Sequence, residues 1–327
     1  MKTRHLPLLL LCLGSFSCDK VKNLAKQARS AVEGKIAKSA GEAGDSVTDP
    51  ELQKLVDQSP DGYVFRKDLP FPSAVEVKTT RVHELSGRFV QTSAIENQAS
   101  TVKGTQTTVT QLARAGDRIR YTLVQSTFAE PVAEGADESE KPVVKQLGPE
   151  TKTHAFRKSS SAWVADQGGG FRTTTLAQQL SPYFQLLMED NALAPRPLWF
   201  GKKRFKIGDQ VVIPDKSLAM LVAGDAKGSF TLTLESIGSV KGHPCGVFNV
   251  TGDYSRAKAP DFEGNLTQED VTIQSGKFWL SLIYPLVLRE ETDTIQTTRS
   301  GSSGNAATRG GGSVKVSVIR EWKKTGP

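Results

Sequence analysis

Most of the chain is a succession of long segments in which apolar and polar residues alternate, and this pattern limits the fold more than any other feature. The clearest example is 313–323, where Val314, Val316, Val318 and Trp322 lie on one side of a predicted strand. Strands joined by short turns favour antiparallel pairing, because parallel strands need long, usually helical, crossovers. We therefore expect a mainly β fold of the α+β class, built as a curved antiparallel meander or half-barrel.

Predicted strands fill the chain from residue 63 onward. The best-defined hairpin turns at Ala115–Gly116–Asp117, and Ile119, Tyr121 and Leu123 share one side of its second strand. The predicted strands are 74–94, 101–113, 118–130, 151–164, 210–213, 218–222, 230–237, 245–254, 271–283, 286–298 and 313–323. The segment 299–312 is rich in Gly, Ser and Thr without an apolar anchor, so we expect a disordered loop there.

One helical pattern interrupts the strands. Its apolar stripe recurs at helical spacing through Leu176, Leu180, Phe184, Leu187 and Met188. We expect a central helix at about 173–193, with the sheet of the 63–327 domain wrapped around it.

The N-terminal residues 1–17 have the pattern of a secretory signal peptide. Lys2 and Arg4 precede the apolar stretch 6–13, which is much shorter than the roughly 20 residues needed to span a bilayer. The small residues Ser15 and Ser17 then precede Cys18. Cleavage before Cys18 is expected, and export to the cell envelope follows from it.

Residues 15–18 also resemble a bacterial lipobox, in which the cysteine is acylated and becomes the N-terminus. This resemblance implies a bacterial cell-envelope lipoprotein that is anchored to a membrane by a lipid on Cys18, facing the periplasm or the cell surface. The alternative is an ordinary secreted periplasmic protein in which Cys18 is incidental.

The segment 18–62 is expected to be a lipid-anchored helical tether or linker. Its apolar stripe is rich in alanine, with Lys22, Lys26 and Arg29 beside it. A basic amphipathic segment near anionic headgroups and a solvated linker are both consistent with this composition. A second short helix is predicted to begin with Asp49 as N-cap and Pro50 at the first helical position.

Charge and cysteine content narrow the classes of function. Loss of residues 1–17 lowers the formal net charge from +7 to about +5, which is far from the dense basic surface of a nucleic-acid-binding protein. We therefore expect no nucleic-acid partner. Cys245 is the one cysteine left for the folded domain, so a buried core rather than an internal disulfide must stabilise it.

Several short phrases lead into predicted strands and resemble those of a known group. They are Phe205–Gln210, Ser236–Gly238 with Lys241–Cys245, Gly276–Leu280, and Tyr284–Leu286. Together they resemble bacterial envelope lipoprotein domains of uncharacterised function, which are similar in layout to the half-open β-barrels of outer-membrane lipoprotein carriers. The resemblance covers roughly 63–323 as an order of elements. It implies a fold and assigns no functional residues.

The sequence contains no recognisable catalytic, nucleotide-binding or metal-binding motif. His83, His154 and His243 have no partner at metal-ligand spacing, so we expect no metal, no cofactor and no enzymatic activity. His243 is interpreted as a turn residue and Cys245 as a small buried group.

Each of two clusters of charged residues can be interpreted either as solvent-exposed or as part of a ligand-binding site. On a strand, Glu291 and Asp293 point to one face and Glu290 points to the other. This arrangement favours a solvated edge over a cation site. The basic run is interpreted as a solvated strand approach, with a phosphate or lipid-headgroup contact as the alternative; it consists of Arg196, Lys202, Lys203, Arg204 and Lys206.

Three classes of function follow. The first is a non-enzymatic, membrane-anchored envelope lipoprotein with a structural or assembly role and an envelope protein as partner. The alternative is a binding module that holds an apolar ligand or lipid under the curved sheet, and the second alternative is an unrecognised enzyme. The candidate ligand-lining residues are Phe184, Leu187, Trp199, Phe230, Phe278 and Trp279.

The lipid anchor gives the first testable prediction. Replacing Cys18→Ala removes the only acylation site, so the protein should move from the membrane fraction to the soluble periplasmic fraction. Fractionation followed by a high-salt wash measures this. Sedimentation of the variant with membranes after the wash would contradict the anchor.

Overall fold

The computed structural model describes residues 48–92, 97–129, 144–146, 152–159, 162–165, 200, 202–218, 226–258, 266–301 and 307–326. The predicted signal peptide, Cys18, most of the predicted tether and the predicted central helix at 173–193 lie outside these residues. The wrapping of the sheet around a helix, like the helical character of the tether, therefore stays a prediction.

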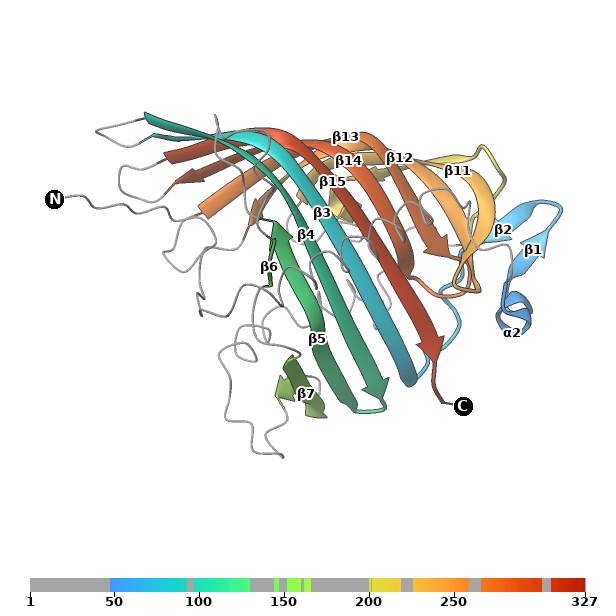
Figure 1. The fold of residues 1–327 in the computed structure, drawn as a ribbon. Coiled ribbons are helices and arrows are strands. Elements are labelled where there is room, and N and C mark those ends of the chain that lie inside the picture. The colour runs from blue at the N-terminus through green and yellow to red at the C-terminus, as the bar shows by residue number, and fades with distance from the viewer. Residues whose placement is uncertain are drawn as a thin grey trace.

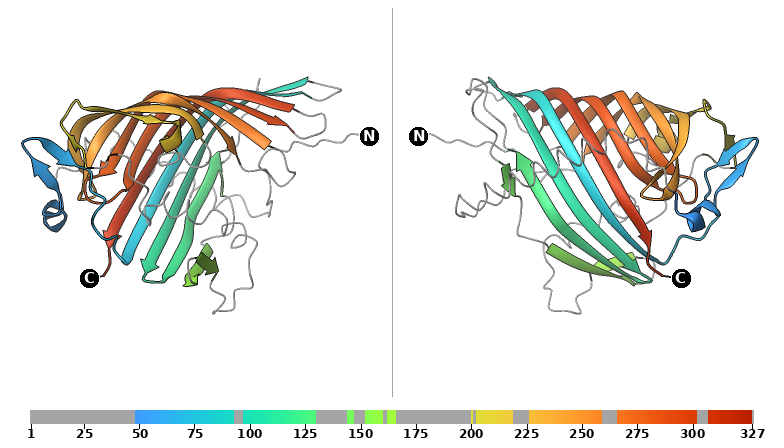
Figure 2. Two further views of the ribbon diagram at one scale, coloured as in Figure 1. Left: turned by 180° about the vertical axis from the view of Figure 1, so that it is seen from behind. Right: turned by 45° about the vertical axis from the view of Figure 1, so that its right-hand side comes forward.

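Long antiparallel strands dominate the described residues. They are β3 (Ala74–Thr92), β4 (Asn97–Ala115), β5 (Arg118–Ala129), β6 (Val144–Gln146), β7 (Lys152–Ser159), β8 (Ala162–Ala165), β10 (Gln210–Pro214), β11 (Ala226–Val240), β12 (His243–Lys258), β13 (Leu266–Ser281), β14 (Val287–Gly301) and β15 (Ala307–Lys324). All belong to one sheet in the order β10-β11-β12-β13-β14-β15-β3-β4-β5-β7-β8, with β6 beside β5. Figures 1 and 2 show this sheet twisting and curving along its width.

The mainly β, antiparallel prediction is confirmed. In the part of the chain that the structure describes, the end strands β10 and β8 do not pair with each other, so the sheet is not closed. The hairpin predicted to turn at 115–117 is also confirmed, and its turn is shorter by one residue, because Ala115 belongs to β4 and pairs with Arg118. Ile119 is buried on that hairpin, as its alternation indicates.

Two consecutive meanders share this sheet, and they meet where the first long strand pairs with the last. The pairing of β15 with β3, called here the β15–β3 seam, runs without a register shift from Ala307 opposite Thr92 to Lys324 opposite Val75. Neighbouring strands otherwise follow one another in sequence. The seam is thus the long-range contact that joins the two halves of the sheet.

Glycines allow the two backbones to approach closely at the seam. Gly87 and Gly312 are directly paired. A Cβ atom on Gly312 would lie 2.3 Å from the Ser86 carbonyl oxygen and 2.5 Å from the Gly87 Cα atom. A side chain at position 312 therefore requires the two strands to move apart.

Two local predictions are corrected. The segment 299–312 is not a loop throughout, because β14 continues to Gly301 and β15 begins at Ala307. The backbone groups of residues 307–312 pair with β3 across the seam, which needs no apolar side chain. The strand predicted at 218–222 is wrong at its start, since Leu218 ends the short helix α5 (Asp215–Leu218).

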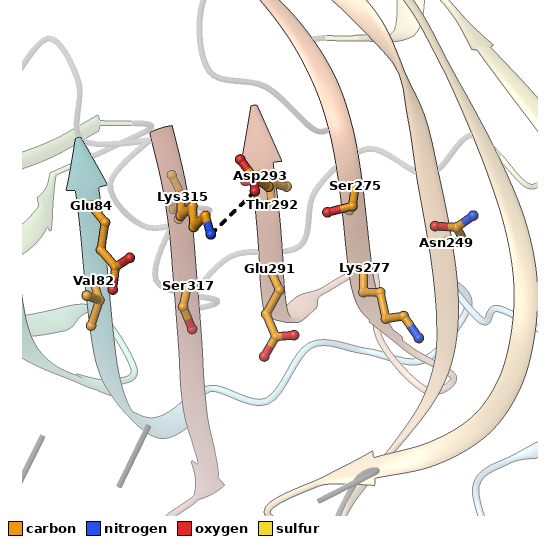
Figure 3. A pocket seen from close by; sticks show the side chains of 12 residues that line it. Val82, Glu84, Asn249, Ser275, Lys277, Glu291, Thr292, Asp293, Lys315 and Ser317 are labelled. Atoms are coloured by element: carbon orange, nitrogen blue, oxygen red, sulfur yellow. Dashed lines mark ion pairs between the residues drawn. The ribbon is translucent and has the colours of Figure 1, made fainter. Parts of the chain in front are cut away.

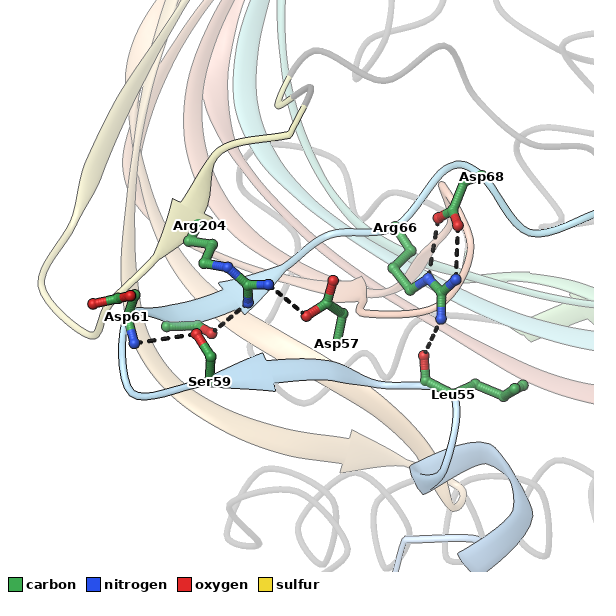
Figure 4. Close-up of polar contacts among 8 residues, drawn as sticks. Leu55, Asp57, Ser59, Asp61, Arg66, Asp68 and Arg204 are labelled. Atoms are coloured by element: carbon green, nitrogen blue, oxygen red, sulfur yellow. Dashed lines mark hydrogen bonds and ion pairs between the residues drawn. The ribbon is translucent and has the colours of Figure 1, made fainter.

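A small second sheet lies at one end of the molecule. It contains β1 (Asp57–Ser59), β2 (Gly62–Val64) and β9 (Arg204–Phe205), in the order β1-β2-β9. Figure 4 shows the polar contacts that hold it: the Arg204 guanidinium lies 2.7 Å from Asp57, and Arg66 donates to the Leu55 carbonyl at 2.9 Å. This sheet joins the N-terminal segment to a strand about 140 residues later in the chain.

The short helix predicted after Asp49 is confirmed as α2 (Pro50–Gln53), with Asp49 as N-cap and Pro50 in the first turn. The Asp49 side chain accepts hydrogen bonds from the Glu51 and Leu52 amides, and its own amide donates to the Gly242 carbonyl at 2.8 Å. Figure 1 shows α2 beside β1 and β2, at the same end of the molecule as the small sheet.

The seam glycine gives the second prediction. Gly312→Ala should lower the free energy of unfolding by about 1–3 kcal/mol, because the added methyl group forces apart two paired backbones. Gly238→Ala is the matched control, since a Cβ atom there would meet Val247 at an ordinary 3.7 Å. Urea denaturation followed by circular dichroism compares them, and equal midpoints for the two variants would show that the seam tolerates the extra atom.

Candidate functional site

The cross-strand register divides the long sheet into two faces. Phe278 of β13 lies between Phe248 of β12 and Glu290 of β14, and this side also bears Val318. We call this side, which holds most of the buried apolar residues, the apolar face. The opposite side, called the charged face, bears Lys277, Glu291, Asp293 and Lys315.

Phenylalanine rings fill the apolar face near β11–β13. Phe65, Phe200 and Phe205 come from outside the long sheet and surround Phe248, with centroid distances of 5.1, 5.7 and 6.1 Å. Gly246 is needed beneath them, because a Cβ atom there would lie 2.4 Å from the Phe65 ring. Phe205 of the small second sheet and the nearby Phe65 and Phe200 thus occupy this part of the apolar face themselves.

A second aromatic group packs around Trp322, which belongs to the apolar face through its register with Val77. The Trp322 ring centroid lies 5.2 Å from His243, 5.5 Å from Tyr284 and 6.4 Å from Phe71. These contacts cover the C-terminal end of β15 with a side chain of β12, His243, and with Tyr284 and Phe71 from two connecting segments. Protein rings therefore pack on the apolar face at two separate places.

Buried charge also lies on the apolar face. Arg320 is fully buried, and its guanidinium contacts the Glu290 carboxylate at 2.6 Å and donates to the Val287 carbonyl at 3.0 Å. On the same face, Arg256 pairs with the buried Glu269 at 2.7 Å. Removing one partner of a buried pair typically costs about 3–5 kcal/mol, so these groups fix the packing around them.

His243 lies at the strand end beside the Trp322 group and hydrogen-bonds with Ser281, at 2.6 Å between Nε2 and Oγ. The Ser281 oxygen also accepts the amides of Ile283 and Tyr284, so its proton is directed at His243. His243 is 1% exposed and Ser281 is 3% exposed. The interpretation of His243 as a turn residue is corrected: it is the first residue of β12 and is buried.

This serine–histidine pair is unsuited to nucleophilic catalysis. Burial lowers the pKa of His243 from an ordinary 6.5 to about 3, which makes it a weak base. Burial also raises the pKa of the neighbouring Cys245 thiol, so a thiolate is disfavoured. Cys245 is fully buried, which confirms its interpretation as a small apolar group.

A depression of about 410 Å³ lies on the charged face, across five neighbouring strands from β12 to β3. Figure 3 shows the side chains that line it, including Lys277, Glu291, Asp293, Lys315 and Ser317. Lys315 lies 3.6 Å from Asp293 on the adjacent strand. The volume of the depression suits a small polar ligand or a side chain of a partner protein.

Alternating charges form two cross-strand rows in this depression. One row pairs Glu84, Lys315 and Asp293, and the other pairs Ser317, Glu291 and Lys277. Lys277 also bridges at 2.8 Å to Glu235, outside the depression. The prediction that Glu291 and Asp293 share a face without Glu290 is confirmed, because Glu290 lies on the apolar face with Arg320. Their placement at a solvated edge is wrong, because β14 pairs with β13 on one side and with β15 on the other.

Of the three predicted ligand-lining residues that the structure describes, two lie together. Phe230 and Phe278 pack edge to face on the apolar face, 6.5 Å apart, whereas Trp279 lies on the charged face beneath Arg289, 4.5 Å away. Adjacent strand residues point to opposite faces, so Phe278 and Trp279 cannot line one cavity. Phe184, Leu187, Trp199 and the lipidation site Cys18 lie outside the described residues.

The sequence analysis did not predict the ion pair between the buried Arg320 and the half-buried Glu290. They are on different strands, and no local pattern joins them. The alternation of β15 places Arg320 on the same side as Val318 and Trp322, and that position is the only sequence signal for its burial.

Among the described residues, no helix is both long and apolar enough to cross a bilayer. Within the same residues, no group of three or more His, Cys, Asp and Glu side chains is arranged to hold a metal ion.

No known protein family and no curated protein matches the sequence. Two solved structures are similar in part. Lipovitellin, from a study of its lipid–protein interactions, matches at 10% identity and a TM-score of 0.34, over 79% of this chain and 26% of its own. A DUF1329 family protein from Desulfovibrio piger matches at 7% identity and a TM-score of 0.14, over 75% of this chain and 85% of its own.

The chain thus spans about a quarter of the lipovitellin chain. At these TM-scores neither likeness supports an inference about what the protein binds, and the resemblance to lipoprotein carriers stays a prediction.

The buried histidine gives the third prediction. Because its pKa is lower in the folded state, neutral His243 contributes stability that is complete above pH 6.5 and is lost as the pH falls towards 3. Between about pH 7.5 and pH 5 the loss should be about 2 kcal/mol. Urea denaturation at both pH values measures it.

The matched variants isolate this contribution. His243→Gln should be less stable at neutral pH and should lose less stability on acidification, whereas His83→Gln should retain the full pH dependence. An unchanged pH dependence in His243→Gln would mean that His243 is accessible to protons in the folded protein.

Proposed function

We propose that the protein is a non-enzymatic lipoprotein of the bacterial cell envelope, anchored to a membrane through Cys18, with a structural or assembly role. The observation that supports this role most is the filling of the apolar face. Phe65, Phe200 and Phe205 occupy one part of it, and the Trp322 group occupies another. A sheet whose apolar face is packed by its own rings serves as a rigid scaffold.

The buried ion pair supports the same role. An acyl chain lying along the apolar face would run past Arg320 and Glu290, and it would offer neither of them a hydrogen bond. Burying charged groups against hydrocarbon is strongly unfavourable unless their partners are kept. The face therefore suits interlocking protein side chains better than a long lipid chain.

The charged face supplies a surface through which a scaffold can act. Its two rows of alternating charge and its depression of about 410 Å³ are complementary to a polar partner, such as another envelope protein. Cross-strand pairing fixes these side chains in register, so the pattern they present is rigid.

Enzymatic function receives no support from the buried serine–histidine pair. Both side chains are sequestered from solvent, and His243 is kept neutral by burial rather than by a catalytic partner. We therefore propose a non-enzymatic role.

An apolar-ligand site is the second candidate. It is favoured by the open sheet and by the Phe230–Phe278 pair, whose rings lie together on the apolar face. A ligand there would contact β11 and β13 on the side of the sheet away from the charged depression.

Native mass spectrometry of the Cys18→Ala protein, purified from its own envelope, distinguishes the two candidates and gives the fourth prediction. The scaffold role predicts a protein without bound lipid. It also predicts that Val314→Trp, on the apolar face where Val314 is 6% exposed, lowers the free energy of unfolding by about 1–3 kcal/mol through overpacking.

Lys315→Trp is the matched control, because the neighbouring residue lies on the charged face with a side chain that is 61% exposed. It should leave the stability nearly unchanged. A stoichiometric co-purified lipid would favour the apolar-ligand site over the scaffold role.

A further inference from the structure

A turn at one end of the molecule holds a large apolar side chain in solvent. Ile207, between β9 and β10, is 62% exposed, the largest exposed fraction among the exposed large apolar residues of the described chain. Val212, on the adjoining β10, is 61% exposed. Single exposed apolar residues are common on protein surfaces, so the surroundings of Ile207 decide its meaning.

The turn is rigid. Asp209 accepts a hydrogen bond from the Lys206 amide through its side chain at 3.0 Å, and its own amide donates to the Lys206 carbonyl at 3.0 Å. Gly208 adopts a positive φ of 93° and donates to the Leu234 carbonyl at 2.8 Å. Ile207 is therefore held outward by the backbone and does not fold back onto the sheet.

Lysines surround this apolar tip. Lys202, Lys203 and Lys206 are all exposed in the segment that leads to the turn. Lys203 lies over the Phe205 ring, 4.6 Å from its centroid, and Lys206 lies 4.0 Å from the exposed Asp61. Arg204 differs from them, because it pairs with Asp57 and holds the segment to β1 and β2.

The N-terminal segment joins the folded domain at this same end. β9 pairs with β2, and α2 lies beside β1 in Figures 1 and 4. The segment 18–47 between the predicted anchor and the described chain has 30 residues. Even fully extended it would reach only about 100 Å, and it reaches less where it is helical. An anchored molecule therefore keeps this end close to the bilayer more readily than the far ends of the strands.

We propose that the Lys206–Asp209 turn, with Ile207 at its tip and Lys202 and Lys203 beside it, docks on the surface of an anionic phospholipid bilayer. Ile207 enters the headgroup region, and the lysines pair with lipid phosphates. The inference rests on the proposed membrane anchor and adds an orientation to it: the small second sheet faces the bilayer.

The test attaches the protein to vesicles through a histidine tag in place of its own lipid anchor, so that the result does not depend on acylation. The chain from residue 19 onward carries an N-terminal histidine tag and binds vesicles of phosphatidylcholine with a nickel-chelating lipid, with or without phosphatidylglycerol. Cys245 is fully buried, so the single thiol introduced by Ile207→Cys accepts an environment-sensitive fluorophore. Ile295→Cys is the matched control, at a side chain that is 50% exposed on β14.

On vesicles with phosphatidylglycerol, the label at position 207 should shift to shorter wavelength and be quenched by lipid-borne quenchers, while the label at 295 should not. Without a tag, vesicle binding should fall about fivefold for each of Lys202→Glu and Lys203→Glu, since one lysine near an anionic surface contributes about 1 kcal/mol. Equal quenching at positions 207 and 295 would overturn the proposal.

Failure of this test and failure of the anchor are separable. If Cys18→Ala releases the protein from membranes but the label at 207 stays in water on tagged vesicles, the anchor stands and the orientation is wrong. If the label at 207 enters the bilayer although Cys18→Ala remains membrane-bound, the orientation stands and the acyl anchor is wrong.

Discussion

The pairing of the first long strand with the last is the interaction on which the rest of the structure depends. Every other pair in the long sheet joins strands that follow one another with few intervening elements, whereas the β15–β3 seam joins residues 75–92 to residues 307–324. Without it, the two meanders would each expose an edge that invites aggregation. Contacts of such high sequence separation are costly to close, so we expect the seam to be completed late in folding.

The seam also creates the two continuous faces. Because it keeps register over its whole length, Val314, Val318 and Trp322 of β15 continue the apolar face of β12–β14 into β3. On the other side it brings Glu84 next to Lys315, which completes the charged rows. The scaffold and the surface we propose for partner binding thus have the same origin.

Some polar groups of this scaffold are buried and others are exposed to solvent, and the two environments give them different roles. Arg320 and His243 are buried, where a lost partner or a bound proton would be costly, so they specify packing. Lys277 and Lys315 lie in the solvated depression, where charge contributes little to stability and is available for recognition. The lysines near Ile207 form a third group, at the end where the N-terminal segment enters.

The sequence by itself determined the features that depend on local periodicity. These are the antiparallel strands, the hairpin at Gly116–Asp117, the Asp49 cap and the separation of Glu291 from Glu290 across one strand. Only the tertiary structure decided which strands meet and what lies above them. Gly310 to Gly312 became a strand because β3 supplies their hydrogen-bond partners, and Arg320 became buried because Glu290, 30 residues away, neutralises it. Both outcomes depend on contacts between distant residues, and a local pattern contains no information about its distant partner.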